Sequence, residues 1–157
     1  ACLCLRCTVG TVPEILPPPA SELVAAFCAP HTAPSRAARV HSSLTVGARA
    51  LSKHTHRSLG NWWGTFSGGE SQKNAVAETM VRKILEKCVW INIFKLPHGT
   101  VALELRVEEG YGARWWLERP PGETPGENGE ENETSWAFRG FVEPAMEDGH
   151  EKGWVHG

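Results

Sequence analysis

The clearest pattern in the chain is a stripe of apolar residues at helical spacing between residues 70 and 88. Its members recur three and four positions apart and are Ala77, Met80, Val81, Ile84, Leu85 and Cys88. Residues at this spacing line one face of an α-helix. The stripe therefore predicts an amphipathic helix with one buried face. Ser67 and Glu70 fit a capping box at its start, and Cys88 is expected to be a buried small hydrophobe rather than a nucleophile.

Four segments with the character of β-strands follow this helix. They span residues 89–96, 101–108, 111–118 and 136–142. In the second segment Val101, Leu103, Leu105 and Val107 alternate with Ala102, Glu104, Arg106 and Glu108. Such alternation is typical of a strand with one buried face. The predicted fold class is α+β, with one amphipathic helix packed on a four-stranded antiparallel sheet and a disordered N-terminal tail.

The hydrophobic pattern also predicts the register of the second and third strands. A three-residue connection at 109–111 sets Leu105 opposite Trp115 and keeps apolar side chains on one face. The same register sets Arg106 opposite Arg114 on the outer face. Two facing arginines repel each other unless an anion lies between them.

Proline and charge divide the chain into two parts. Residues 1–69 hold six of the eleven prolines and only two acidic residues. We expect residues 1–60 to be a disordered, Pro/Ala-rich basic tail and residues 61–157 to form one small α+β domain. An acidic, flexible loop is expected within that domain at residues 119–135, which are rich in proline, glycine and glutamate.

The acid-free stretch 23–69 has the arginine- and serine-rich composition of an organelle transit peptide. A basic disordered tail explains the same composition equally well. The opening residues lack the pattern of a signal peptide, so we expect an intracellular protein, mitochondrial or in another organelle if the targeting interpretation holds and otherwise cytoplasmic. No apolar run is long enough for a transmembrane helix.

The cysteines give weak evidence for a metal site. Cys2, Cys4 and Cys7 lie close together but lack the second pair of ligands that zinc sites of known spacing have. We therefore expect a disordered tail there, with no metal and no cofactor.

The candidate ligand-binding residues are Arg106, Arg114, Trp116 and Arg139, which the strand pattern places on the outer sheet face. Arginine forks bind carboxylates and phosphates, and an exposed tryptophan can stack on a flat ligand. The alternative interpretation is a solvated face on which glutamates such as Glu104 neutralise the arginines.

Three functional hypotheses follow. The first is a non-catalytic binding module that holds an anionic small molecule or a partner protein on the outer face. The scarcity of aromatic residues in the basic tail argues against nucleic acid as the partner. The second is a small enzyme whose acid–base group is His150, assisted by Glu147, Asp148 or Glu151. The third is an imported subunit of a larger assembly that makes contacts through Trp62 and Trp63. No catalytic residue and no oligomeric state is assigned from the sequence.

Overall fold

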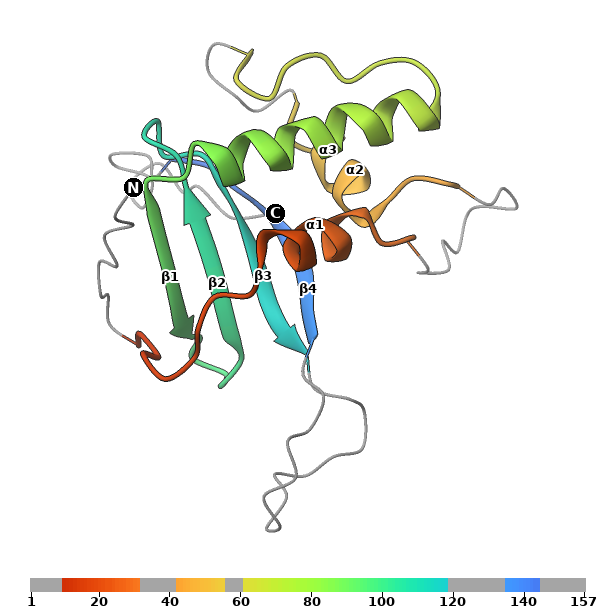
Figure 1. The fold of residues 1–157 in the computed structure, drawn as a ribbon. Helices are drawn as coiled ribbons and strands as arrows, with labels where there is room; N and C mark the ends of the chain where they lie inside the picture. The colour runs from red at the N-terminus through yellow and green to blue at the C-terminus, as the bar shows by residue number, and fades with distance from the viewer. Residues whose placement is uncertain (1–9, 32–41, 56–60, 119–134, 145–157) are drawn as a thin grey trace.

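The computed structural model describes residues 10–31, 42–55, 61–118 and 135–144 (Figure 1). Its elements in chain order are α1 (Ala20–Cys28), α2 (Val46–Leu51), α3 (Glu70–Glu86), β1 (Trp90–Lys95), β2 (Val101–Arg106), β3 (Gly112–Glu118) and β4 (Ser135–Val142). The strands form one antiparallel sheet in the order β1-β2-β3-β4. The predicted α+β class and the four-stranded antiparallel sheet are therefore confirmed. Within the described residues, no helix has the length and apolarity needed to cross a membrane.

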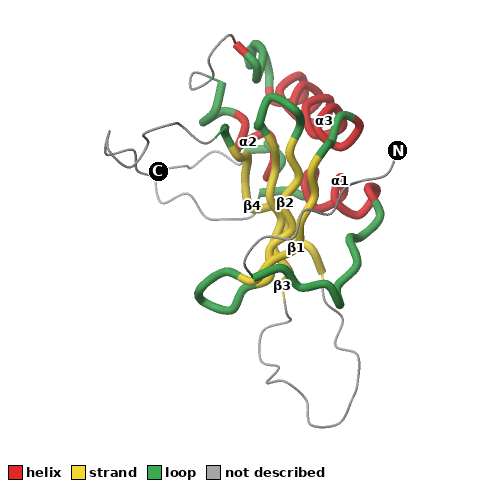
Figure 2. Tube along the Cα trace, turned by 90° about the vertical axis from the view of Figure 1, so that its left-hand side faces the viewer, coloured by secondary structure: helices red, strands yellow, loops and turns green. Residues whose placement is uncertain are grey.

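The helices give the sheet two different faces. Helices α1 and α3 lie on the same side of the sheet, with α3 running across the ends of the strands (Figures 1 and 2). We call this side the covered face; it carries Leu103, Leu105, Trp115, Phe138 and Phe141, all buried. The predicted stripe on α3 contributes to the same core, because Ala77, Met80, Val81 and Ile84 are buried as well.

Helix α1 belongs to this core, although the sequence pattern placed it in a tail. Leu23 and Phe27 are buried, and the ring centroid of Phe27 lies 4.7 Å from that of Phe138. The indole N–H of Trp115 donates a hydrogen bond to the carbonyl oxygen of Leu23 at 3.1 Å. A nine-residue helix is marginal by itself and takes its stability from tertiary packing. The local sequence therefore carried little sign of it.

Helix α2 packs beside α1 through a glycine. A Cβ built on Gly47 would lie 2.1 Å from the ring of Phe27, so this position admits no side chain unless the ring moves. Ala48 and Leu51 are fully buried around the same contact. The prediction of one helix thus describes α3 and leaves out α1 and α2. The division of the chain at residue 61 stays a prediction, and residues 1–9, 32–41 and 56–60 lie outside the described ranges.

The start of α3 differs from the predicted capping box. The N-cap is Gly69, and no side chain caps the helix there. The Glu70 carboxylate instead accepts hydrogen bonds from the hydroxyls of Ser42 and Ser43 and from the Ser43 amide, at 2.6–2.7 Å. These bonds lower the pKa of Glu70 from 4.5 to about 2. Glu70 therefore joins α3 to the segment before α2. Ser43 and Glu70 are 27 positions apart, so a local motif cannot reveal this contact.

The register of β2 and β3 is shifted from the predicted one by two residues. Leu103 lies opposite Trp115, and Leu105 lies opposite Ala113. The connection has three residues, as expected, but it spans 108–110, because the Val107 N–H bonds the carbonyl oxygen of Tyr111. A shift of two preserves the side-chain faces. Arg106 consequently faces Gly112 rather than Arg114, and Glu104 faces Arg114.

Candidate functional site

The side of the sheet opposite the helices is polar at its centre, and we call it the polar face. It carries Glu104, Arg106, Arg114 and Trp116, which alternate along β2 and β3 with the core residues of the covered face. Glu104 is 3% exposed and lies at the middle of this surface. A buried carboxylate needs charged or hydrogen-bonding partners to offset its lost hydration.

Two arginines supply these partners. Nε of Arg106 donates to one oxygen of Glu104 at 2.6 Å. Nε of Arg114 donates to the other oxygen at 2.8 Å, and its Nη2 bonds that same oxygen. The expectation that Glu104 neutralises the two arginines is therefore confirmed, whereas the expected solvated face is wrong for Glu104, which is buried. One carboxylate between two guanidinium groups leaves a local charge of +1, so the cluster still favours a further anion.

Arg106 is also fixed to the ends of the neighbouring strands. Its Nη1 donates to the carbonyl oxygens of Gly110 at 2.7 Å and of Glu143 at 3.1 Å. These contacts join the β2–β3 turn to the residue that follows β4. The Arg106 and Arg114 side chains remain 28% and 34% exposed. Each guanidinium has five N–H donors, so both keep donors beyond those that bond Glu104.

The aromatic part of the polar face lies beside this cluster. The guanidinium of Arg139 lies 5.0 Å from the ring centroid of Trp116. The Trp116 indole N–H donates to Glu118 at 3.0 Å. Arg114 similarly lies 5.7 Å from the ring centroid of Phe94 on β1. The structure therefore brings all four predicted residues onto one face.

A β-bulge places Arg139 there. Arg114 pairs with Gly140 and Trp115 pairs with Phe138, which leaves Arg139 without a partner in the ladder. Phe138 and Phe141 are three positions apart, so strict alternation would send their rings to opposite faces. The extra residue restores both rings to the covered face and turns Arg139 outward, where it is exposed.

The edge of the polar face is extended by a segment that precedes α1. Thr11 forms a bridge with Phe94, and its hydroxyl donates to the side-chain oxygen of Asn92 at 3.1 Å. Asn92 is fully buried and lies opposite Glu104. Amide, carboxylate and guanidinium groups therefore form one row across β1, β2 and β3.

Sequence reasoning missed one polar pair at the rim of the sheet. Nδ1 of His54 lies 2.9 Å from the Glu143 carboxylate, 89 positions along the chain. The imidazole packs beside the rings of Trp63 and Phe141, which places it on the side of the covered face. Because Glu143 also accepts the bond from Arg106 through its carbonyl oxygen, the His54 contact holds the residue that supports Arg106. No local pattern predicts a pair so distant in sequence.

Of the two tryptophans expected to contact other subunits, Trp63 lies in the core and Trp62 is partly buried against it. Trp63 is fully buried. Trp62 stacks on Tyr111 with ring centroids 4.4 Å apart, and Lys83 covers it at 4.3 Å. That expectation is therefore wrong for Trp63, since large aromatic side chains fill the space between a helix and a small sheet.

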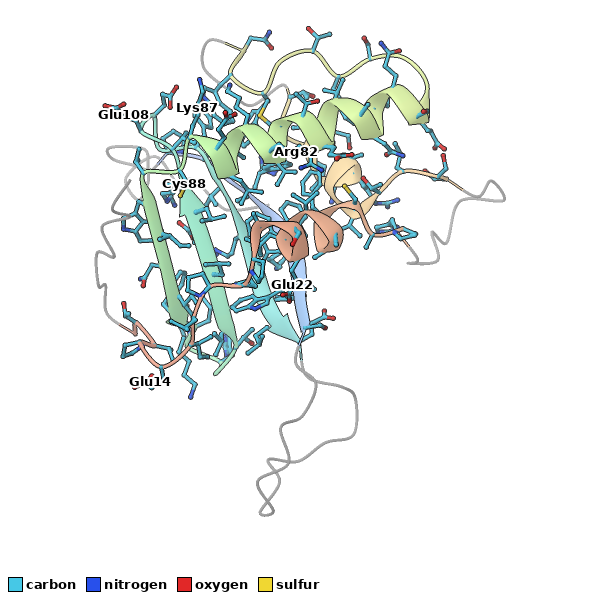
Figure 3. All side chains as sticks on the ribbon, viewed as in Figure 1. Glu14, Glu22, Arg82, Lys87, Cys88 and Glu108 are labelled. Atoms are coloured by element: carbon cyan, nitrogen blue, oxygen red, sulfur yellow. The ribbon has the colours of Figure 1, made fainter. Side chains whose placement is uncertain are left out.

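Other candidate groups are less suited to chemistry. Cys88 lies where α3 leads into β1 (Figure 3). Burial raises the pKa of its thiol, and Sγ contacts the carbonyl oxygen of Trp90 at 3.1 Å. Both features fit an unreactive thiol, although Cys88 is only partly buried where the pattern predicted a buried side chain. A hollow of about 320 Å³ beside α3 is lined mainly by apolar atoms around Val76, Thr79 and Met80 and lies apart from the glutamate–arginine cluster.

Within the described ranges, no group of three or more His, Cys, Asp or Glu side chains could hold a metal ion. The Cys2–Cys7 cluster, almost all of the acidic loop at 119–135 and the His150 group lie outside those ranges.

The structure thus combines an α+β fold with a polar face on which Glu104 is held between Arg106 and Arg114. A family model, described as the CdiA C-terminal tRNase toxin domain, matches residues 33–120. This range covers more than half of the chain, and the chain belongs to that family. Glu104, Arg106, Arg114 and Trp116 lie inside the matched range, whereas Arg139 lies outside it. No curated protein and no solved structure matches the chain.

This assignment corrects two predictions made from the sequence. A non-catalytic binding module is wrong for a member of a family of tRNA-cleaving toxins. The argument against nucleic acid as a partner is wrong for the same reason. That argument considered the aromatic content of the basic tail and ignored the sheet, where arginine and tryptophan lie together.

Proposed function

We propose that this protein is a ribonuclease that cleaves tRNA on the polar face. The membership of the chain in the tRNase toxin family carries this proposal. The glutamate–arginine cluster supports it, because the cluster falls inside the matched range and consists of groups that RNA cleavage uses. The proposal keeps the four ligand-binding residues predicted from the sequence and changes their ligand to RNA.

The arginines would bind the phosphate that is cleaved. Arginine forks match the geometry of phosphate oxygens and hold them through charge-assisted hydrogen bonds. Arg106 and Arg114 are fixed by Glu104 on one side, and each keeps N–H donors that bond none of the described residues. Donors fixed before the substrate arrives stabilise the charge that develops on phosphorus without reorganisation.

Glu104 would act as the proton acceptor. In the reaction we propose, the ribose 2′-oxygen attacks the adjacent phosphorus and loses its proton to Glu104. The 5′-oxygen of the next nucleotide leaves and takes a proton from water. The products are a 2′,3′-cyclic phosphate and a 5′-hydroxyl end. Both arginines contact the Glu104 carboxylate, so a phosphate held between them would place the neighbouring hydroxyl beside that carboxylate.

The proposal is tested by incubating the purified chain with total tRNA and resolving the products on a denaturing gel. We expect discrete fragments from the wild type, and a loss of cleavage of at least about a hundredfold in Arg114→Ala. Arg82→Ala is the matched control, because Arg82 is an exposed arginine on α3 that pairs with Glu78. Intact tRNA after prolonged incubation with folded wild-type protein would contradict the proposal.

A further inference from the structure

The pair formed by Trp116 and Arg139 has no task in the reaction described above. Trp116 lies on β3 two residues beyond Arg114, and the two side chains therefore project from the same face. Arg139 comes from the bulge of β4 and lies outside the matched family range. An aromatic ring and a guanidinium beside a phosphate-binding cluster form a suitable surface for a nucleobase.

The neighbours of Trp116 leave it accessible. Its partners in the ladder are Ala102 on β2 and Ala137 on β4, so no large side chain lies directly opposite it on either strand. The indole stays partly exposed at the surface. Its N–H is held by Glu118 and its face by Arg139, so the ring orientation is set in the free protein. A preorganised ring loses little entropy when a ligand stacks on it.

Resting on the proposed function, we propose that Trp116 and Arg139 hold an unpaired nucleobase of the RNA. The phosphate of that nucleotide then lies at Arg114, two residues along the same strand. Stacking on an aromatic side chain or a guanidinium plane is the common mode of recognition for unpaired bases. A base inside a duplex is already stacked on both faces and cannot reach a ring on a sheet surface. The substrate is therefore a single-stranded part of tRNA, a loop or an unpaired end, and not a paired stem.

Binding is measured first with a probe that cannot be cleaved. A single-stranded oligodeoxyribonucleotide of about ten nucleotides lacks the attacking 2′-hydroxyl, and its duplex provides the paired comparison. We expect the wild type to prefer the single strand. Trp116→Ala should weaken that binding by roughly five- to 150-fold, because stacking contributes about 1–3 kcal/mol per base. Trp116→Phe should restore most of the loss, since any aromatic face can stack.

Arg139→Ala and Arg82→Ala form the matched arginine comparison. Both arginines are exposed, but only Arg139 lies over Trp116. We expect weaker single-strand binding in Arg139→Ala and unchanged binding in Arg82→Ala. Thermal unfolding of each variant separates a change in binding from a change in folding. Equal affinity for single strand and duplex, or unchanged single-strand binding in folded Trp116→Ala, would overturn the inference.

The cleavage position gives the second readout. An end-labelled tRNA transcript should be cut in an unpaired region, and Trp116→Ala should raise KM more than it lowers kcat. Cuts confined to paired stems would overturn the inference and leave the proposed ribonuclease activity standing. A second outcome is that single-strand binding depends on Trp116 but tRNA is not cleaved at all. It would overturn the proposed activity and retain the nucleobase surface.

Discussion

The two faces of the sheet differ in what their side chains contact: one packs apolar rings, and the other forms ion pairs. On the covered face, Phe138 and Phe141 pack edge-to-face against Phe27 of α1, and Trp115 packs edge-to-face against Phe138. On the polar face, Glu104 of β2 holds the guanidinium groups of Arg106 and Arg114 through ion pairs. We infer that the covered face stabilises the fold by burying apolar area. In the proposed function, the charged groups of the polar face carry out the chemistry. Substitutions on the two faces should therefore change different measurements.

The largest effect on stability is expected from Trp115→Ala. The indole is fully buried, and its N–H bonds the Leu23 carbonyl oxygen. Its loss leaves a cavity and an unsatisfied acceptor, so we expect the free energy of unfolding to fall by about 3–5 kcal/mol. Chemical denaturation measures this change. If Trp115→Ala unfolds at the wild-type denaturant concentration, the covered face does not stabilise the fold as described.

A smaller loss is expected from Gly47→Ala. The added methyl would meet the Phe27 ring at 2.1 Å, and the α1–α2 contact would have to separate. Overpacking of this kind costs about 1–3 kcal/mol. Gly64→Ala is not an equivalent control because its φ of 73° is strained for alanine. Gly69→Ala is the better control, since nothing lies within 4 Å of its Cβ position.

The salt dependence of RNA binding should show whether Arg114 on the polar face contacts a phosphate. Each phosphate contact with a single strand contributes roughly −0.7 to the slope of log affinity against log salt. We expect Arg114→Ala to make the slope shallower by about that amount, while the slope of Arg82→Ala stays at the wild-type value. Affinities measured over a range of salt concentrations give both slopes. Equal slopes for wild type and Arg114→Ala would remove Arg114 from the phosphate contacts.

The smallest effect is expected at Glu70 and depends on pH. Its pKa is about 2 in the folded chain against an ordinary 4.5. A lowered carboxyl pKa stabilises the fold above the ordinary value, and the gain disappears as pH falls through about 2. The Tm of Glu70→Gln should therefore lie below that of the wild type at pH 6 and converge with it towards pH 2. A difference that stays constant with pH would assign the effect to something other than ionisation.

The sequence predicted well what depends on local periodicity. The stripe from Ala77 to Ile84 marked α3, and alternation in β2 assigned Leu103 and Glu104 to their correct faces. The residues of the polar face were found for the same reason. The grouping of Glu104, Arg106, Arg114 and Trp116 required only a correct choice of side for β2 and β3, and a register error of two residues does not change that side.

Contacts between distant segments could not be predicted in this way. Helix α1 depends on Trp115, 92 positions beyond Leu23, and His54 meets Glu143 across 89 positions. The register of β2 and β3 was set by hydrogen bonding around the 108–110 turn, which apolar matching alone does not resolve. The choice between a binding surface and an enzyme also had no local signal. Arginines can serve either purpose, and the family match identified the chain as a member of a tRNase toxin family.

The measurement that tests the central claim most directly is a comparison of Glu104→Gln with the wild type in tRNA cleavage and in RNA binding. Glutamine keeps the shape of Glu104 but cannot accept the 2′-hydroxyl proton, and it removes the negative charge between Arg106 and Arg114. We predict that cleavage falls by about 10²–10⁴-fold while affinity for RNA is retained or increased. A folded Glu104→Gln variant that cleaves tRNA at the wild-type rate would contradict the assignment of the polar face as the catalytic surface.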